Sequence, residues 1–224
     1  MAASKHASES AAGAGVASRA SRRPDRPRSA AKYDAKRQDV IDIAARVFAE
    51  KGFHATSIGD LVEATGLQRG GLYHYIEGKH ELLLAIHERF IEPLLANARE
   101  IVAEDLPPDE TVRRLAHALM QDIADYRDQV TVFLHEWRVL RDTPEWERVH
   151  EARREFETLI ESVLADGERT GLFAVSDVRL TTYAFLGIFN YTYTWFDPNG
   201  TSTPDDLAER FVGIFLEGIV ARNR

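Results

Sequence analysis

The chain has 224 residues, of which 44% are hydrophobic, enough to bury one core of ordinary size and a smaller satellite. It contains no cysteine, which excludes disulfides and cysteine-ligated zinc, and no apolar run approaches the ~20 residues of a membrane-spanning helix. The net charge of −8 is uneven: residues 1–37 hold nine Lys and Arg against three Asp and Glu. That segment therefore carries +6, and residues 38–224 carry −14.

Residues 1–33 are rich in Ala, Ser and Arg, and we expect them to form a disordered basic arm. The stretch 11–17 is too short and too weakly apolar for a secretory signal, so the sequence predicts a cytoplasmic protein. A basic arm ahead of an acidic body can direct a nucleic-acid-binding surface. It can equally be a solvated tail with no partner.

The segment from Asp34 to Tyr75 predicts three helices. The first carries apolar residues at helical spacing and ends at a left-handed glycine, Gly52, after which Phe53 can contact Phe48. A short second helix begins near Thr56 or Ser57, where Ser57 and Asp60 approximate a capping box, and it ends at Gly66. The third follows after a few residues, giving the order helix, glycine-containing turn, helix.

The rest of the chain predicts helices as well, because no stretch alternates with a period of two. One runs from Lys79 to about Val102 with a bend at Pro93, and another starts after Pro108. Further start signals and breaks lie at Asp128, Thr143-Pro144-Glu145, Gly171, Ser176-Asp177, Trp195 and Thr203-Pro204. We therefore expect an all-α fold of about nine helices.

Residues 56–67, continued by Gly70, 72–75, Lys79 and 81–82, resemble the tetracycline-repressor (TetR) family of regulators, as does the first helix end at 48–53. This resemblance implies a helix-turn-helix DNA-binding domain at residues 34–80 and a larger effector-binding and dimerisation domain at 81–224. The implied function is a ligand-responsive transcriptional regulator, most simply a repressor, that binds a palindromic operator as a homodimer and is released by a small-molecule effector.

The third helix departs from the family pattern at Gln68, Gly71, Ile76 and His80. Gln68 is a poor N-cap, and Gly70 and Gly71 each cost the helix ~1 kcal/mol relative to Ala. We therefore expect this helix to be marginal until DNA orders it.

Residues near the start of a recognition helix contact base edges in the major groove. In this chain they are Gln68, Arg69, Gly70, Gly71 and His74. Arg69 can bind guanine with both nitrogens of its fork, although a solvated charge is the alternative, and Gln68 can pair with adenine. The family pattern implies phosphate contacts from Thr56, Tyr73 and Lys79.

Candidate effector-binding residues are the aromatic and polar side chains of the middle helices, each of which can also be ordinary core. They are His117, Phe133, His135, Trp137, Tyr183, Asn190, Tyr191 and Trp195. Residues 190–200, and Trp137 within 135–138, resemble a subgroup that regulates fatty-acid and steroid catabolism, several members of which sense acyl-CoA thioesters. Asp197 stands where that subgroup commonly has a basic residue. Phosphate contacts could instead come from arginines elsewhere in the middle helices. The alternative is that these arginines only lie on a helix surface. They are Arg138, Arg141, Arg148, Arg153 and Arg154.

The final helix carries an apolar stripe, and Gly187 before it permits a close approach. The family pairs the corresponding helices with their symmetry mates, so the expected dimer interface is Gly187, Leu207, Phe211, Ile214, Phe215 and Gly218. An intramolecular stripe is the alternative.

Other functional classes have less support. The chain lacks the motifs of serine hydrolases, phosphate-binding loops and zinc proteases, so we expect no enzyme, and neither a cofactor nor a metal. A multidrug-sensing or antibiotic-sensing repressor of an efflux gene remains the alternative, and it would need aromatic residues rather than cations around its ligand.

Overall fold

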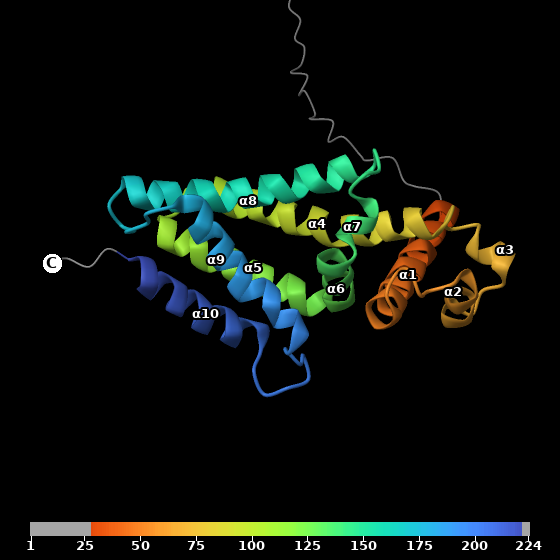
Figure 1. The fold of residues 1–224 in the computed structure, drawn as a ribbon. Helices are drawn as coiled ribbons and strands as arrows, with labels where there is room; N and C mark the ends of the chain where they lie inside the picture. Colours follow the sequence, from red (N-terminus) through yellow and green to blue (C-terminus); the bar gives the residue numbers. More distant parts are fainter. Residues whose placement is uncertain (1–27, 221–224) are drawn as a thin grey trace, which may run out of the picture.

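The computed structural model describes residues 28–220, and within them the chain is all-α, as predicted (Figure 1). Ten α-helices and one 3-10 turn form in these residues, one more helix than the approximate count expected, and a lone antiparallel bridge joins Phe173 to Val220. The elements are α1 (Arg28–Lys51), α2 (Ile58–Thr65), α3 (Arg69–Leu72), α4 (Lys79–Ala103), α5 (Pro108–Asp125), α6 (Arg127–His135), α7 (Trp137–Leu140), α8 (Trp146–Arg169), α9 (Val178–Asn190), η1 (Tyr191–Thr194) and α10 (Pro204–Ile219).

The first three helices lie at one end of the molecule, and their local structure follows the predicted signals (Figure 1). Gly52 and Gly66 adopt the left-handed φ values of 81° and 65° that end α1 and α2. The rings of Phe48 and Phe53 meet edge to face with centroids 5.3 Å apart. Ser57 caps α2 through the complete capping box with Asp60.

Helix α1 begins at Arg28, earlier than the start expected at Asp34. Residues 28–33 are thus the first turns of this helix rather than the end of an arm. The predicted basic arm itself lies outside the described residues over positions 1–27. The earlier start matters because it brings Tyr33 to the DNA-binding end.

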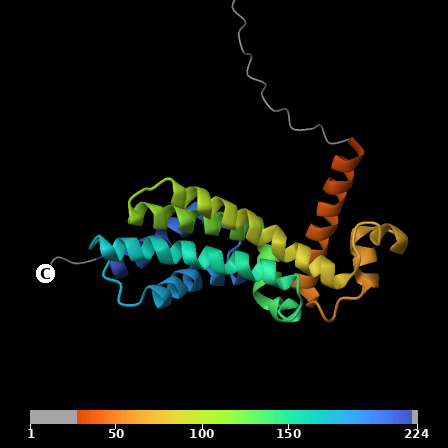
Figure 2. The same cartoon turned by 90° about the horizontal axis from the view of Figure 1, so that it is seen from above.

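Helix α4 connects that end to the rest of the molecule and continues through Pro93. It lies alongside α8 for most of its length, as both views show (Figures 1 and 2). Eleven of its residues are buried, on a stripe that also packs against α1, α5 and α6. Any displacement along α4 is therefore carried to α1–α3.

Two helix ends differ from those predicted. The Thr143 hydroxyl donates to the carbonyl oxygen of Leu140, which continues the turn after α7, so α8 starts at Trp146 instead of being capped by Thr143. Helix α9 ends at Asn190, not Trp195, and the chain tightens into the 3-10 turn η1. Helix α10 starts as predicted, with the Thr203–Asp206 capping box, and packs on α5. None of the described helices has the length and apolar character needed to cross a membrane.

Candidate nucleic-acid interface and ligand cavity

The short helix α3 presents an exposed face at the end of the molecule. Gln68, Arg69 and Gly70 are exposed, as are His74 and Tyr73 in the following turn, while Gly71 is half-buried. The helix is a single turn of four residues, and the Gln68 side chain makes no capping hydrogen bond. The predicted weakness of this helix is therefore present in the structure.

Tyr33 of α1 supports the turn after α3. Its hydroxyl donates to the carbonyl oxygen of His74 at 3.0 Å, and its ring lies 5.3 Å from the His74 ring and 5.1 Å from the Tyr75 ring. Sequence reasoning missed this residue because it assigned Tyr33 to the arm. A continuation of helical spacing upstream of Asp34 was the available signal.

Two of the residues predicted to contact phosphates make hydrogen bonds within the protein. Thr56 is only 1% exposed, and its hydroxyl donates to the carbonyl oxygen of Gly52. The Lys79 ammonium donates to the carbonyl oxygens of Phe53 and Thr56 and lies 4.5 Å from the Phe53 ring centroid. In this structure both side chains hold the turn between α1 and α2, and their contacts with DNA phosphates stay a prediction.

One of the two carboxylates of α2, that of Asp60, is compensated within the domain. Lys51 donates to Asp60 at 2.6 Å, and Ser57 donates to the same carboxylate through both its hydroxyl and its backbone N–H. These bonds, with Lys51 first, hold the pKa of Asp60 well below its usual range. Arg69, by contrast, has no ion-pair partner among the described residues and extends a free cation from α3.

An apolar cavity lies between α4, α5, α6, α8 and α9. Its buried walls are Phe90, Ile91, Leu94, Leu119, Val130, Phe133 and Phe156, and its partly exposed border includes Arg153, Glu157, Leu186 and Asn190. The free space is only about 30 Å³, roughly the volume of one water molecule. The cavity is therefore almost closed in this structure.

A more open groove of about 490 Å³ adjoins the cavity, and Arg153 and Glu157 line both. The groove runs along α7 and the start of α8 and also contains Trp137, Arg141, Trp146 and His150. The Arg153 guanidinium lies 6.0 Å from the Phe133 ring centroid and donates to Glu157 at 3.2 Å. The ion pair of Arg153 and Glu157 thus stands where the apolar cavity meets the surface, and the groove also holds Arg141 beside Asp142.

The predicted effector residues divide into three groups. Phe133 and Asn190 line the cavity, and Trp137 lines the adjoining groove. His117 instead bonds Asp205 at 2.9 Å and Glu209 at 3.4 Å, linking α5 to α10, and exposed His135 contacts the Tyr193 hydroxyl. Tyr183, Tyr191 and Trp195 are exposed outside the cavity, because α9 turns the opposite face inward. The cavity wall from α4 was missed, although its spacing of 90, 91 and 94 was a usable signal.

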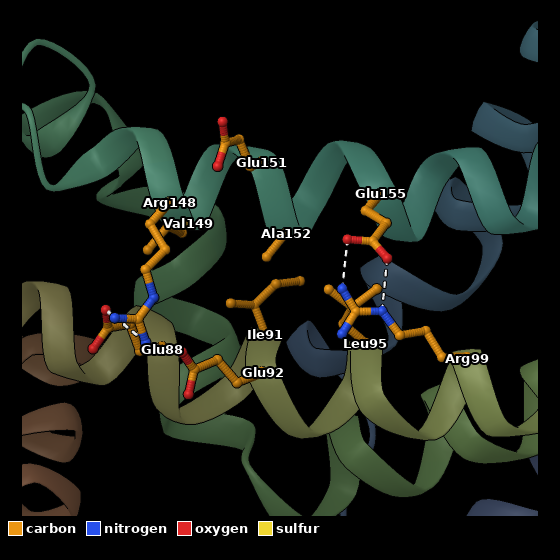
Figure 3. A pocket seen from close by; sticks show the side chains of 10 residues that line it. All are labelled: Glu88, Ile91, Glu92, Leu95, Arg99, Arg148, Val149, Glu151, Ala152 and Glu155. Carbon is orange, nitrogen blue, oxygen red and sulfur yellow. Dashed lines mark hydrogen bonds and ion pairs between the residues drawn. The ribbon is translucent and has the colours of Figure 1, made fainter.

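The remaining arginines are mostly paired. Between α4 and α8 lies a groove of about 350 Å³ in which Arg148 bonds Glu92 and approaches Glu88, while Arg99 forms two bonds with Glu155 (Figure 3). Four acidic side chains line this groove against the two arginines. Arg154 pairs with Glu147, and Arg138 lies over Trp137.

Comparison with known families decides the classification. A model described as Tetracyclin repressor-like, C-terminal domain, matches residues 105–219, and one described as Bacterial regulatory proteins, tetR family, matches residues 40–86. The chain belongs to the TetR family. This confirms the predicted family and its function as a ligand-responsive, DNA-binding transcriptional repressor.

Similar TetR proteins include the HTH-type transcriptional repressor KstR2 of Rhodococcus jostii, which is 29% identical over 83% of this chain and 92% of its own length. The structure of the ketosteroid transcriptional regulator KstR2 of Mycobacterium tuberculosis is 26% identical, with a TM-score of 0.79 over 84% of this chain and 96% of that chain. The TetR regulator PfmR of Thermus thermophilus is 28% identical, with a TM-score of 0.73 over 80% and 97% of the two chains.

One face of this TetR chain, formed by α9, η1 with Trp195, and α10, is exposed and apolar; we call it the α9–α10 face. Five of the seven most exposed large hydrophobic side chains among residues 28–220 lie on it, namely Leu180, Tyr183, Tyr191, Trp195 and Ile214. Gly187 and Gly218 are exposed beside them with nothing within 4 Å of an added Cβ. Leu207 and Phe215, predicted for the dimer interface, are instead buried against their own protomer, and Phe211 is half-buried against Phe189 and Trp195.

Proposed function

We propose that this TetR regulator is a repressor whose effector has an apolar body and an anionic end, with acyl-CoA thioesters as the chemical class. The observation that carries this proposal is the meeting of the apolar cavity with the groove at Arg153. An acyl group matches the buried aromatic and aliphatic walls, and phosphates would replace Asp142 and Glu157 as partners of the Arg141 and Arg153 guanidinium groups. The similarity to a ketosteroid transcriptional regulator supports an apolar ligand.

Closure of the cavity supplies the mechanism of release. Because only about 30 Å³ is free, an acyl group can enter only by separating the helices that wall the cavity. Interiors are close-packed, so such a displacement shifts whole helices rather than being absorbed locally. Phe90, Ile91 and Leu94 form one wall, and α4 leads directly to the DNA-binding domain.

The DNA contacts follow from the exposed face of α3. Arg69 would bind a guanine edge, with Gln68 and His74 beside it, and Gly70 and Gly71 would let the backbone approach closely. Tyr73, 47% exposed, would donate its hydroxyl to a phosphate. Lys79 and Thr56 would position the α1–α2 turn, and its backbone, rather than their side chains, would meet the duplex.

A second copy of this chain is the proposed occupant of the α9–α10 face. The face is apolar, lies away from α3, and has two glycines that permit close helix approach. Two copies related by a two-fold axis would present both α3 helices to successive major grooves, about 34–36 Å apart, which explains the palindromic operator we expect.

A labelled duplex, selected by the wild-type protein from a random pool, provides the test. We expect medium-chain and polycyclic CoA thioesters to release the duplex, and free CoA or the free acids to do so far less well. Arg153→Gln should weaken the response, whereas Arg154→Gln, a neighbouring exposed arginine paired with Glu147, should not. Release by cationic drugs but by no thioester would favour the multidrug alternative and refute the proposal.

A further inference from the structure

Glu136 lies between α6 and α7, yet its carboxylate reaches the DNA-binding domain. Its Oε1 accepts the backbone N–H of Phe53 at 2.9 Å, across 83 positions of sequence. A Cβ at neighbouring Gly52 would lie 3.6 Å from the same oxygen, so the turn and the carboxylate are in close contact. A carboxylate accepting a peptide N–H makes a charge-assisted bond, roughly twice as strong as a neutral one.

The turn that Glu136 holds, residues 52–56, determines where α2 and α3 lie. Gly52 reverses the chain with a φ of 81°, and Phe53 is buried at 2% exposure. Lys79 holds the carbonyl oxygens of Phe53 and Thr56 from the start of α4. The turn is therefore held from two sides, by the ammonium of Lys79 and by the carboxylate of Glu136.

Within residues 28–220, Glu136 alone connects the later helices to the α1–α2 turn by a side-chain bond. It is the one side chain beyond α4 that forms a hydrogen bond or ion pair with residues 52–78 there. The other polar contacts of α6 with this end go to α1: Gln129 donates to Asp42 at 2.8 Å, and Asp128 approaches Arg46 at 3.9 Å. They fix α1, which in turn contacts α2 through the Lys51–Asp60 ion pair and the turn after α3 through Tyr33 and His74.

The same junction borders the space for ligand. Phe133 and Leu134, just before Glu136, line the cavity, and Trp137, just after it, lines the adjoining groove. A change in the packing of either therefore displaces Glu136 directly. No other residue of the described chain combines this placement with a bond to the turn.

We propose that Glu136 is a positioning residue that couples the α6–α7 junction to the α1–α2 turn, so that ligand space and recognition helix sense each other through its bond to Phe53. The proposal rests on the established DNA binding and not on the chemical class of the effector. Coupling is reciprocal, so DNA that fixes α2–α3 must also restrain the α6–α7 junction.

Hydrogen exchange of the full-length protein, free and bound to the selected duplex, tests this without an effector. In the wild-type protein we expect DNA to slow exchange of amides 136–142. Glu136→Asp keeps the charge but is one methylene, about 1.5 Å, too short. It should speed exchange of the Phe53 amide at least about tenfold and abolish the effect of DNA on 136–142.

Glu136→Gln keeps the reach with a neutral, weaker acceptor, so it should retain part of the Phe53 protection and still respond to DNA. Glu145→Asp, the same substitution at an exposed acid before α8, should behave as wild type. Unchanged melting temperatures would separate coupling from simple destabilisation. An undiminished DNA effect in Glu136→Asp, no DNA effect in the wild-type protein, or a Gln variant that protects Phe53 but loses the DNA effect would each overturn the proposal.

Discussion

Tyr33 donates its hydroxyl to the carbonyl oxygen of His74, and this bond ties the first turns of α1 to the turn that follows α3. Because α3 has one turn and no side-chain cap, its position depends on such outside support. Tyr33→Phe should weaken operator binding by about 1 kcal/mol, the typical net value of one hydrogen bond, with little change in melting temperature. Fluorescence anisotropy with the selected duplex measures this. Thr158→Val, which removes a hydroxyl bonded to the carbonyl oxygen of Arg154 on the exposed side of α8, is the control.

Arg69 should determine sequence preference. Arg69→Ala should cost about 1–3 kcal/mol and relax the preference at one base pair in each half-site, because a forked contact to guanine is lost. Tyr73→Phe should weaken binding to all sequences alike, since phosphates are the same at every step. Repeating the duplex selection with each variant checks both outcomes, and an unchanged preference in Arg69→Ala would rule out direct readout by that residue.

Acid should destabilise the fold through His87. This residue is fully buried between Phe133 and Trp146, its Nδ1 bonds the Leu83 carbonyl oxygen, and its Nε2 has no partner among the described residues. Burial lowers its pKa to about 4 from 6.5, so the unfolded chain takes up the proton first. The contribution of neutral His87 to the free energy of unfolding is therefore complete above pH 6.5. It is lost as the pH falls toward 4, and the loss reaches up to about 3 kcal/mol.

Urea unfolding of the wild-type protein and His87→Leu across this range measures that term. Asp122 acts in the opposite direction, because burial, with the charge of Asp125, raises its pKa to about 6. Its contribution is common to both proteins, so the difference between them isolates His87. A difference that stays constant from pH 7 to pH 4.5 would contradict the assignment.

The basic segment before α1 should contribute to DNA affinity by charge alone. Residues 1–27 carry five Lys and Arg against two acids, ahead of residues 34–80, which hold six Lys and Arg against seven acids. Each phosphate neutralised adds about one unit to the slope of log affinity against log salt. Deleting residues 1–27 should flatten that slope by several units and leave effector response and dimerisation unchanged. Parallel slopes for the two proteins would show that the segment makes no ionic contact with DNA.

A charged side chain introduced on the α9–α10 face should weaken the proposed dimer. Ile214 is 66% exposed in the protomer, and burying a carboxylate there between two copies would leave it unpaired. Ile214→Glu should shift the dimer toward monomer in light scattering and reduce operator affinity, with helicity intact. Ser162→Glu on the exposed face of α8 is the control, and a fully dimeric Ile214→Glu would place the interface elsewhere.

Local sequence signals predicted local structure well and distant packing poorly. The stops at Gly52 and Gly66 and the caps at Ser57 and Thr203 depend on neighbours within a few residues, so they were foreseeable. The internal roles of Lys79 and Glu136 depend on contacts across tens of residues. Burial direction on α9 was also missed, because aromatic residues lie on both of its faces, so the exposed side is apolar as well as the buried one.

The near-closure of the cavity has a consequence for the speed of the response. An effector that must await separation of α4 from α6, α8 and α9 cannot bind faster than those helices part. Its observed association rate would then level off as its concentration rises, instead of increasing in proportion. The response time of the regulator would then be set by how fast its own helices separate, and a higher effector concentration would not shorten it.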